Sequence, residues 1–176
     1  KYPHIIEYTV KGNVGQTKIL ENISYISKVE EWDSENKYWI DKDFDTFTNF
    51  IAYNSYQSTG KKNIEVKQKT DPFSSLIFDS NVCLASKIEK TWQINNIRDF
   101  VTNRNKPLFT SKWENISSEY FIDKIPNSEA IDLNKSPFEL EMLRDKYFNI
   151  RMIYKPFNDY KISTDFVSVL NGESYR

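Results

Sequence analysis

The sequence predicts a mainly β domain with inserted helices, built as a small five-stranded barrel. Apolar and polar residues alternate near both ends of the chain, a spacing typical of half-buried strands. Aromatic residues, which favour strands, make up 15% of the chain, and there are only four glycines. The 176 residues suffice for one folded domain. Because no linker-like stretch divides them, we expect a single domain over residues 1–176, in which about 55–110 could form an inserted subdomain.

Strand patterns dominate the first third of the chain. We favour a strand over 22–32, although the isoleucine spacing there also fits a helix, because the turn-forming segment 33–36 follows and strand formers then resume. These two strands should form a hairpin. A second, exposed hairpin is expected within 55–70, around the Gly60-Lys61-Lys62 turn. The strands expected in this third are residues 5–10, 22–32, 37–40 and 46–53.

The middle of the chain is less regular. An apolar run lies within 73–85, and Ser86 with Glu89 has the spacing of a helix-capping box. The apolar residues that follow are loosely helical. A strand through Trp92 and Ile94 is the alternative.

Near the C-terminus, a short helix should precede a hydrophobic hairpin. A capping-box spacing and a proline at the first helical position mark the start of the helix, at Ser136, Pro137 and Glu139. We therefore expect a helix over 137–146. From Phe148 the pattern changes to period two, which predicts strands over 148–155 and 160–166 joined by a turn at 156–159.

Charge and cysteine content exclude several classes of function. The chain has 24 basic and 25 acidic residues and a pI near 6.0, whereas dedicated binders of nucleic-acid backbones are usually basic. The single Cys83 excludes an internal disulfide and a cysteine-based zinc site, and we expect it to be buried. No apolar run of about 18 residues occurs, so we expect no membrane contact. Because the first residue is Lys1, we expect a piece of a longer protein or a processed form.

No catalytic or cofactor site is predicted. Three carboxylates stand two residues apart and could hold a cation, but the calcium-loop pattern fails after them and an exposed acidic turn is favoured, at Asp41, Asp43 and Asp45. His4 is the only histidine, which excludes histidine dyads and histidine-rich zinc clusters. We therefore expect a protein that is not an enzyme and needs no cofactor or metal.

The remaining signal is a set of aromatic residues interleaved with basic ones. Stacking a base on an aromatic ring contributes on the order of 1–3 kcal/mol, so two or three exposed rings and two cations suffice for weak binding of a single strand. Trp32, Tyr38 and Lys161 lie in the same segments. The alternative is that each ring is buried in the core. The candidate nucleic-acid-binding residues are Trp39, Phe47, Phe50, Arg151, Tyr154 and Lys155.

Residues Pro137–Val169 resemble the last oligonucleotide-binding (OB) fold of the large subunit of replication protein A and its telomere-associated paralogues. The expected helix, strand, Asn-Asp turn and strand occur in the order of that domain. Residues Ile23–Asn54 are similar to single-strand-binding barrels of the same family, with a strand, a turn beside a tryptophan, a strand, an acidic turn and a strand ending in asparagine. The resemblance implies an OB-fold-like five-stranded barrel.

The resemblance also implies a function in a DNA replication or telomere-maintenance complex in the nucleus. Such a domain would bind single-stranded DNA with weak to moderate affinity, or partner subunits of the complex, or both. The family's zinc ribbon needs four cysteines and must be lost or replaced here, and because the chain stops at Arg176 the family's C-terminal helix would be short or missing. The alternatives are a purely structural protein–protein interaction domain of a larger assembly, and a cytoplasmic location.

Overall fold

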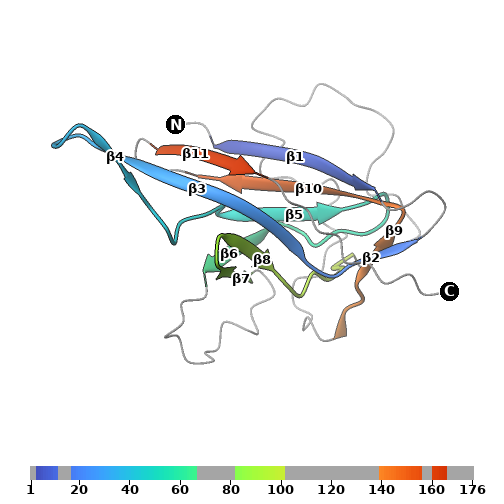
Figure 1. The fold of residues 1–176 in the computed structure, drawn as a ribbon. Coiled ribbons are helices and arrows are strands. Elements are labelled where there is room, and N and C mark those ends of the chain that lie inside the picture. Colours follow the sequence, from blue (N-terminus) through green and yellow to red (C-terminus); the bar gives the residue numbers. More distant parts are fainter. Residues whose placement is uncertain (1–2, 12–16, 67–81, 102–138, 156–159, 166–176) are drawn as a thin grey trace, which may run out of the picture.

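The computed structural model describes residues 3–11, 17–66, 82–101, 139–155 and 160–165, and these residues are mainly β (Figure 1). Nine strands form one mixed sheet that is strongly curled into an open half-barrel. Two further strands form a small separate sheet. The prediction of a mainly β fold is therefore confirmed.

The strands differ widely in length, and the longest has eleven residues. They are β1 (His4–Lys11), β2 (Lys18–Leu20), β3 (Ile23–Asp33), β4 (Tyr38–Asp41), β5 (Asn49–Tyr53), β6 (Lys62–Val66), β7 (Val82–Ile88), β8 (Thr91–Ile94), β9 (Leu143–Asp145), β10 (Tyr147–Tyr154) and β11 (Tyr160–Asp165).

The order of strands in the large sheet is β1-β10-β5-β6-β7-β8-β3-β11, and β4 pairs with β3 outside this path. Neighbouring strands are antiparallel, except that β6 and β7 are parallel. The small sheet joins β2 to β9. Strands from the two ends of the chain are thus direct neighbours in both sheets.

Strand β10 lies next to the edge strand β1 and has both of its own edges paired, one with β1 and the other with β5. Its alternating residues Phe148, Ile150, Met152 and Tyr154 are all buried, as the period-two pattern predicts. Arg151 and Ile153, which point to the other face, are also at least 94% buried. The two paired edges and the buried side chains on both faces make β10 a well-anchored strand of the sheet.

The core lies on the inner face of the curled sheet. Its largest fully buried side chains are Trp92, Tyr25, Tyr154, Phe47, Phe50 and Phe148, which come from four different strands and one loop. Burial of such side chains is the main source of stability in a domain of this kind, at about 25 cal/mol per Å² of apolar surface.

The prediction of a helix over 137–146 is wrong for residues 139–146, the part of this segment that the structure describes. Leu143–Asp145 form strand β9, which pairs with β2, and the Leu143 side chain is fully buried. The helix-capping pattern is a local signal. The pairing of β9 with residues 18–20 and the burial of Leu143 are tertiary interactions, and these override local propensity. Ser136 and Pro137 lie outside the described residues.

The expected C-terminal hairpin is also wrong. Both strands exist, but β10 pairs with β1 and β5, and β11 pairs with β3. The turn expected at 156–159 lies outside the described residues. Alternation identifies a strand, but it does not identify the partner of that strand.

The helical interpretation of the residues after Ser86 is wrong, and the alternative is confirmed. Val82–Ile88 and Thr91–Ile94 form the β7–β8 hairpin, in which Trp92 and Ile94 are fully buried. Within the described residues no helix interrupts the strands. The sheet also has more strands than the five expected and is an open half-barrel.

We expect Phe50→Ala to lower the free energy of unfolding by about 3–5 kcal/mol, because the Phe50 side chain is fully buried opposite Met152 and its removal leaves a cavity. Urea denaturation followed by circular dichroism measures this change. The matched control is Tyr56→Ala, whose ring is 48% exposed and whose loss should change stability by only about 0.5 kcal/mol. Equal stability of the two variants would contradict the core described above.

Candidate interaction surface on the β3–β4 hairpin

The β3–β4 hairpin extends beyond the rest of the sheet and forms one end of the molecule (Figure 1). In its turn the carboxylate of Asp33 accepts hydrogen bonds from the backbone N–H groups of Glu35 and Asn36 at 2.9 and 3.0 Å, and from the Asn36 side chain at 2.8 Å. The Asn36 bonds lower the pKa of Asp33, so this residue stays charged at neutral pH. Lys37 completes the turn in the left-handed region, with φ of 57°. The turn is therefore fixed by specific bonds.

Two tryptophans pack together on the outer face of this hairpin. Trp32 and Trp39 are directly opposite one another in the β3–β4 register, and their ring centroids are 5.2 Å apart. The ammonium group of Lys161, on β11, lies 6.0 Å from the Trp39 ring. Trp39 remains 42% exposed, and Tyr38 beside it is 52% exposed. We use the name hairpin surface for the exposed side chains at this end of the hairpin: Trp32, Trp39 and Lys161 on the outer face, and Tyr38 on the opposite face of β4.

The two faces of β3 explain this exposure. Along the first part of the strand, alternate residues such as Tyr25 and Val29 are buried in the core, whereas Lys28 is exposed. Because Trp32 lies four residues after Lys28, its side chain is on the same outer face. The tryptophan pair is therefore directed away from the core by the strand period.

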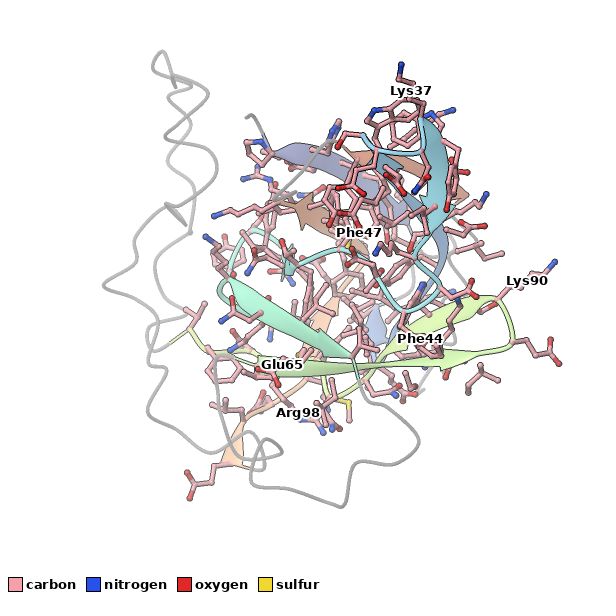
Figure 2. All side chains as sticks on the ribbon, turned by 90° about the vertical axis from the view of Figure 1, so that its left-hand side faces the viewer. Lys37, Phe44, Phe47, Glu65, Lys90 and Arg98 are labelled. Atoms are coloured by element: carbon pink, nitrogen blue, oxygen red, sulfur yellow. The ribbon has the colours of Figure 1, made fainter. Side chains whose placement is uncertain are left out.

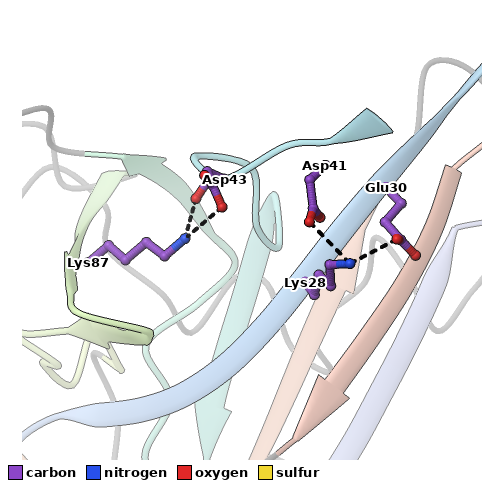
Figure 3. Close-up of polar contacts among 5 residues, drawn as sticks. All are labelled: Lys28, Glu30, Asp41, Asp43 and Lys87. Atoms are coloured by element: carbon purple, nitrogen blue, oxygen red, sulfur yellow. Dashed lines mark hydrogen bonds and ion pairs between the residues drawn. The ribbon is translucent and has the colours of Figure 1, made fainter. Parts of the chain in front are cut away.

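Ion pairs join the strands at the base of the hairpin surface. Lys28 contacts Glu30 at 2.8 Å and Asp41 at 3.1 Å, as Figure 3 shows. The pKa of Lys28 is raised, chiefly by its hydrogen bond to Glu30. On the other side of the hairpin, Lys42 contacts Glu31 at 2.6 Å. These pairs are exposed, so each contributes little stability, but together they fix the position of the hairpin strands.

The three alternating aspartates do not converge on a common point. Asp41 contacts Lys28, and Asp43 contacts Lys87 (Figure 3). Asp45 accepts hydrogen bonds from its neighbour Thr46 and from the Tyr154 hydroxyl. In the described part of the chain, no group of three or more acidic, histidine or cysteine side chains is placed to hold a metal ion.

Three of the six predicted site residues lie in the core. Phe47, Phe50 and Tyr154 are 1%, 0% and 2% exposed, and Figure 2 shows Phe47 in the interior, whereas Lys37 lies at the outer end of the hairpin. The ring of Phe47 packs edge-on against Tyr25, with centroids 5.6 Å apart. Because these three rings are buried, they cannot stack on a base. For them the alternative interpretation, a ring in the core, is the one observed.

Arg151 is held in place by an ion pair and is only 6% exposed. Its guanidinium group donates two bonds to the Glu7 carboxylate, from Nε at 2.7 Å and Nη2 at 2.6 Å. Glu7 is the direct neighbour of Arg151 in the β1–β10 register, and the hydroxyl of Tyr53 donates to the same carboxylate. Arg151 therefore joins three strands rather than facing solvent.

The other two predicted residues, Trp39 and Lys155, are exposed. The structure brings the exposed lysine Lys161 close to the Trp39 ring. The cross-strand pairing of Trp32 with Trp39 also follows from the predicted hairpin. The position of Lys161 beside them depends on the β3–β11 pairing, which no local pattern indicates.

Sequence reasoning missed a buried polar network. The Asp99 carboxylate, 1% exposed, accepts hydrogen bonds from the Gln57 side chain at 3.1 Å and from the backbone of Ser58 and Val101 at 3.2 and 3.0 Å. Gln57 in turn accepts a bond from the backbone N–H of Arg144 at 2.6 Å. These hydrogen bonds connect three segments that are distant in the sequence, around Gln57, Asp99 and Arg144, so the network has a structural role.

Cys83 is buried, as predicted. Desolvation raises the pKa of its thiol to about 11, although the nearby Lys62 acts in the opposite direction. Since the thiolate is the reactive form, this thiol is inert at neutral pH.

We expect Glu7→Gln to destabilise the protein by about 1–3 kcal/mol, because it leaves the buried Arg151 guanidinium with a neutral partner. The side chain of Glu7 is 34% exposed, which keeps the loss below that of a fully buried pair. Thermal and urea denaturation measure the effect. The control is Glu21→Gln, an exposed position between β2 and β3, which should not change stability measurably. A Glu7→Gln protein as stable as the control would show that the pair is unimportant.

The described part of the chain contains no helix that is long and apolar enough to cross a bilayer. When the chain is compared with protein-family models, no family matches, and no curated protein matches its sequence significantly. The geometry of the hairpin surface therefore carries the functional interpretation.

Proposed function

We propose that this protein is a non-catalytic assembly module that binds a protein partner through the hairpin surface. The observation that carries the proposal is the exposure of Trp39 and Tyr38, 42% and 52%, on a projecting hairpin. Tryptophan and tyrosine dominate the binding energy of protein interfaces, and they gather where a partner can desolvate them. Trp39 packs on Trp32 across the hairpin, yet a large part of its ring and of the Tyr38 ring remains in solvent, where a partner can bury it.

The rigidity of the hairpin supports the same function. The Asp33 turn, the Lys28 ion pairs and the packing of Trp32 on Trp39 hold the surface in one geometry. A surface that is already ordered loses little conformational entropy when it binds. A binding role is also supported by the inert Cys83 and by the separation of the aspartates, which leave the described residues without an evident catalytic pair.

We expect a photo-crosslinking amino acid at position 38 to capture one discrete protein in the cells that produce this chain. The same amino acid at position 56 is the matched control, since Tyr56 is 48% exposed and lies in the loop after β5, at the end of the sheet away from the hairpin. The adducts are resolved by gel electrophoresis, with and without nuclease, and identified by mass spectrometry.

A protein adduct from position 38 that is absent from position 56 supports the assembly module. Adducts of equal yield at both positions, or no protein adduct at position 38, would refute it. A nuclease-sensitive adduct would direct attention to the second candidate function.

The second candidate is single-stranded DNA binding within a replication or telomere-maintenance complex in the nucleus. The contact of Lys161 with the exposed Trp39 ring favours it, because an aromatic platform beside a cation is what a single strand requires. The finer fold assignment, to the OB barrel of the replication protein A family, belongs to this candidate. The strongly curled, open sheet supports that assignment, since the OB fold is a partly open barrel.

If this second function holds, oligothymidylate will bind with an affinity that falls as salt is raised, and Trp39→Ala will weaken binding roughly tenfold. Fluorescence anisotropy of a labelled oligonucleotide at low and moderate salt gives both quantities. Tyr56→Ala should leave the affinity unchanged. Absence of binding at low salt would eliminate this candidate.

A further inference from the structure

The hairpin surface lies in the most acidic part of the chain. Residues 30–45 contain seven acidic and two basic residues, whereas the rest of the chain contains 18 acidic and 22 basic residues. Three further lysines contact this region, Lys28 from β3 itself, Lys87 from β7 and Lys161 from β11, yet the carboxylates still outnumber the ammonium groups. An approaching phosphate backbone would therefore meet a negative field, whereas a basic segment would be attracted.

The acidic groups stand beside the tryptophan pair. Glu30 and Asp41 are opposite one another in the register, two residues before Trp32 and two residues after Trp39 respectively. Residues two apart on one face of a strand are separated by about 7 Å. The carboxylates and the indole rings are thus within the reach of one long side chain. Asp41 keeps 50% of its side chain exposed even though it contacts Lys28, so it can accept a second cation.

Trp39 already has a cation near it. The Lys161 ammonium lies 6.0 Å from the centre of the ring, at the outer limit of a cation–π interaction. A guanidinium group can approach more closely, because it is planar, less strongly hydrated than ammonium, and able to stack on indole while its N–H groups bond to a carboxylate. The combination of exposed indole with flanking carboxylates matches arginine better than lysine.

We infer that the partner docks a basic protein segment on the hairpin surface, with an arginine side chain stacked on Trp39 and bonded to the Asp41 carboxylate. This inference rests on the proposed assembly function and specifies the chemistry of the partner. Charge complementarity selects a basic segment, and the tryptophan pair selects arginine within it.

The test is a titration of the 176-residue protein with three matched peptides that alternate glycine with arginine, lysine or glutamate, and with oligothymidylate. Isothermal calorimetry gives the affinities. The indole N–H signals in ¹H–¹⁵N NMR spectra show which tryptophans are contacted, after assignment with single Trp→Phe variants. We expect the arginine peptide to bind several times more tightly than the lysine peptide, and the glutamate peptide not to bind.

Two variants localise the binding. Trp39→Ala should weaken binding of the arginine peptide about five- to tenfold, through loss of the cation–π contact. Asp41→Asn should weaken it by a similar factor while keeping the size of the side chain. The controls are Tyr56→Ala and Glu21→Gln, at exposed positions outside residues 30–45, which should bind as the unmodified protein does.

Equal affinity for all peptides, unchanged affinity in both hairpin variants, shifts of indole signals other than Trp32 and Trp39, or tighter binding of oligothymidylate would each overturn the inference. The proposed function is tested separately by crosslinking from position 38. A crosslinked partner whose contact segment is apolar or acidic would leave the assembly function intact and remove this inference, whereas the absence of any protein adduct would remove both.

Discussion

The whole structure depends on the insertion of β10 between β1 and β5. This strand supplies backbone partners to both neighbours, so the N–H and C=O groups on the facing edges of β1 and β5 are satisfied only when it is in place. Its inner face contributes Ile150 and Met152 to the core. Its other face carries a buried positive charge, which is tolerable because Glu7 on the neighbouring strand neutralises it. In the order of the sheet, β10 thus joins the N-terminal strand β1 to β5 and the strands beyond it.

The hairpin surface follows from the length of β3. The first residues of this strand, Ile23 and Tyr25, pair with β8 and belong to the core. Its last residues pair with β4, and β11 lies along its other edge. One continuous strand therefore anchors the hairpin at one end and carries the tryptophan pair at the other. A binding surface mounted on such a strand is held by the core itself, rather than by a flexible loop.

The sequence predicts the local part of this architecture well. Strands were expected over 5–10, 22–32, 37–40 and 148–155 from strand-forming residues, neighbouring turns or alternating hydrophobicity, and each of these segments overlaps an observed strand. The hairpin at 33–36 was predictable because aspartate and asparagine bond to their own backbone in turns. The partners of β10 and β11 were not predictable, since the paired residues are about 100 or more positions apart in the chain and their contacts leave no local trace. The same limit explains why β9 was predicted as a helix: the local sequence has a helix-capping pattern, but the segment pairs with the distant strand β2.

The candidate site shows a related limit. Period two tells which residues share a face of a strand, but not which face the rest of the chain will cover. Phe47 and Phe50 have the same aromatic character as Trp39, yet they are buried and Trp39 is not. Their burial depends on the curl of the sheet over its inner face. Only the complete set of strand pairings separates a core ring from a surface ring.

The register of β1 with β10 has a consequence for the synthesis of the protein in the cell. Ile5 pairs with Ile153, so β1 leaves the ribosome long before its neighbour exists. At a translation rate of about 5–20 residues per second, the wait lasts several seconds or more. During that time β1, and β5 once it has been made, present unpaired backbone edges, the kind of template on which strands of other nascent chains can add. From this topology we expect the nascent chain to need protection by chaperones until β10 is synthesised.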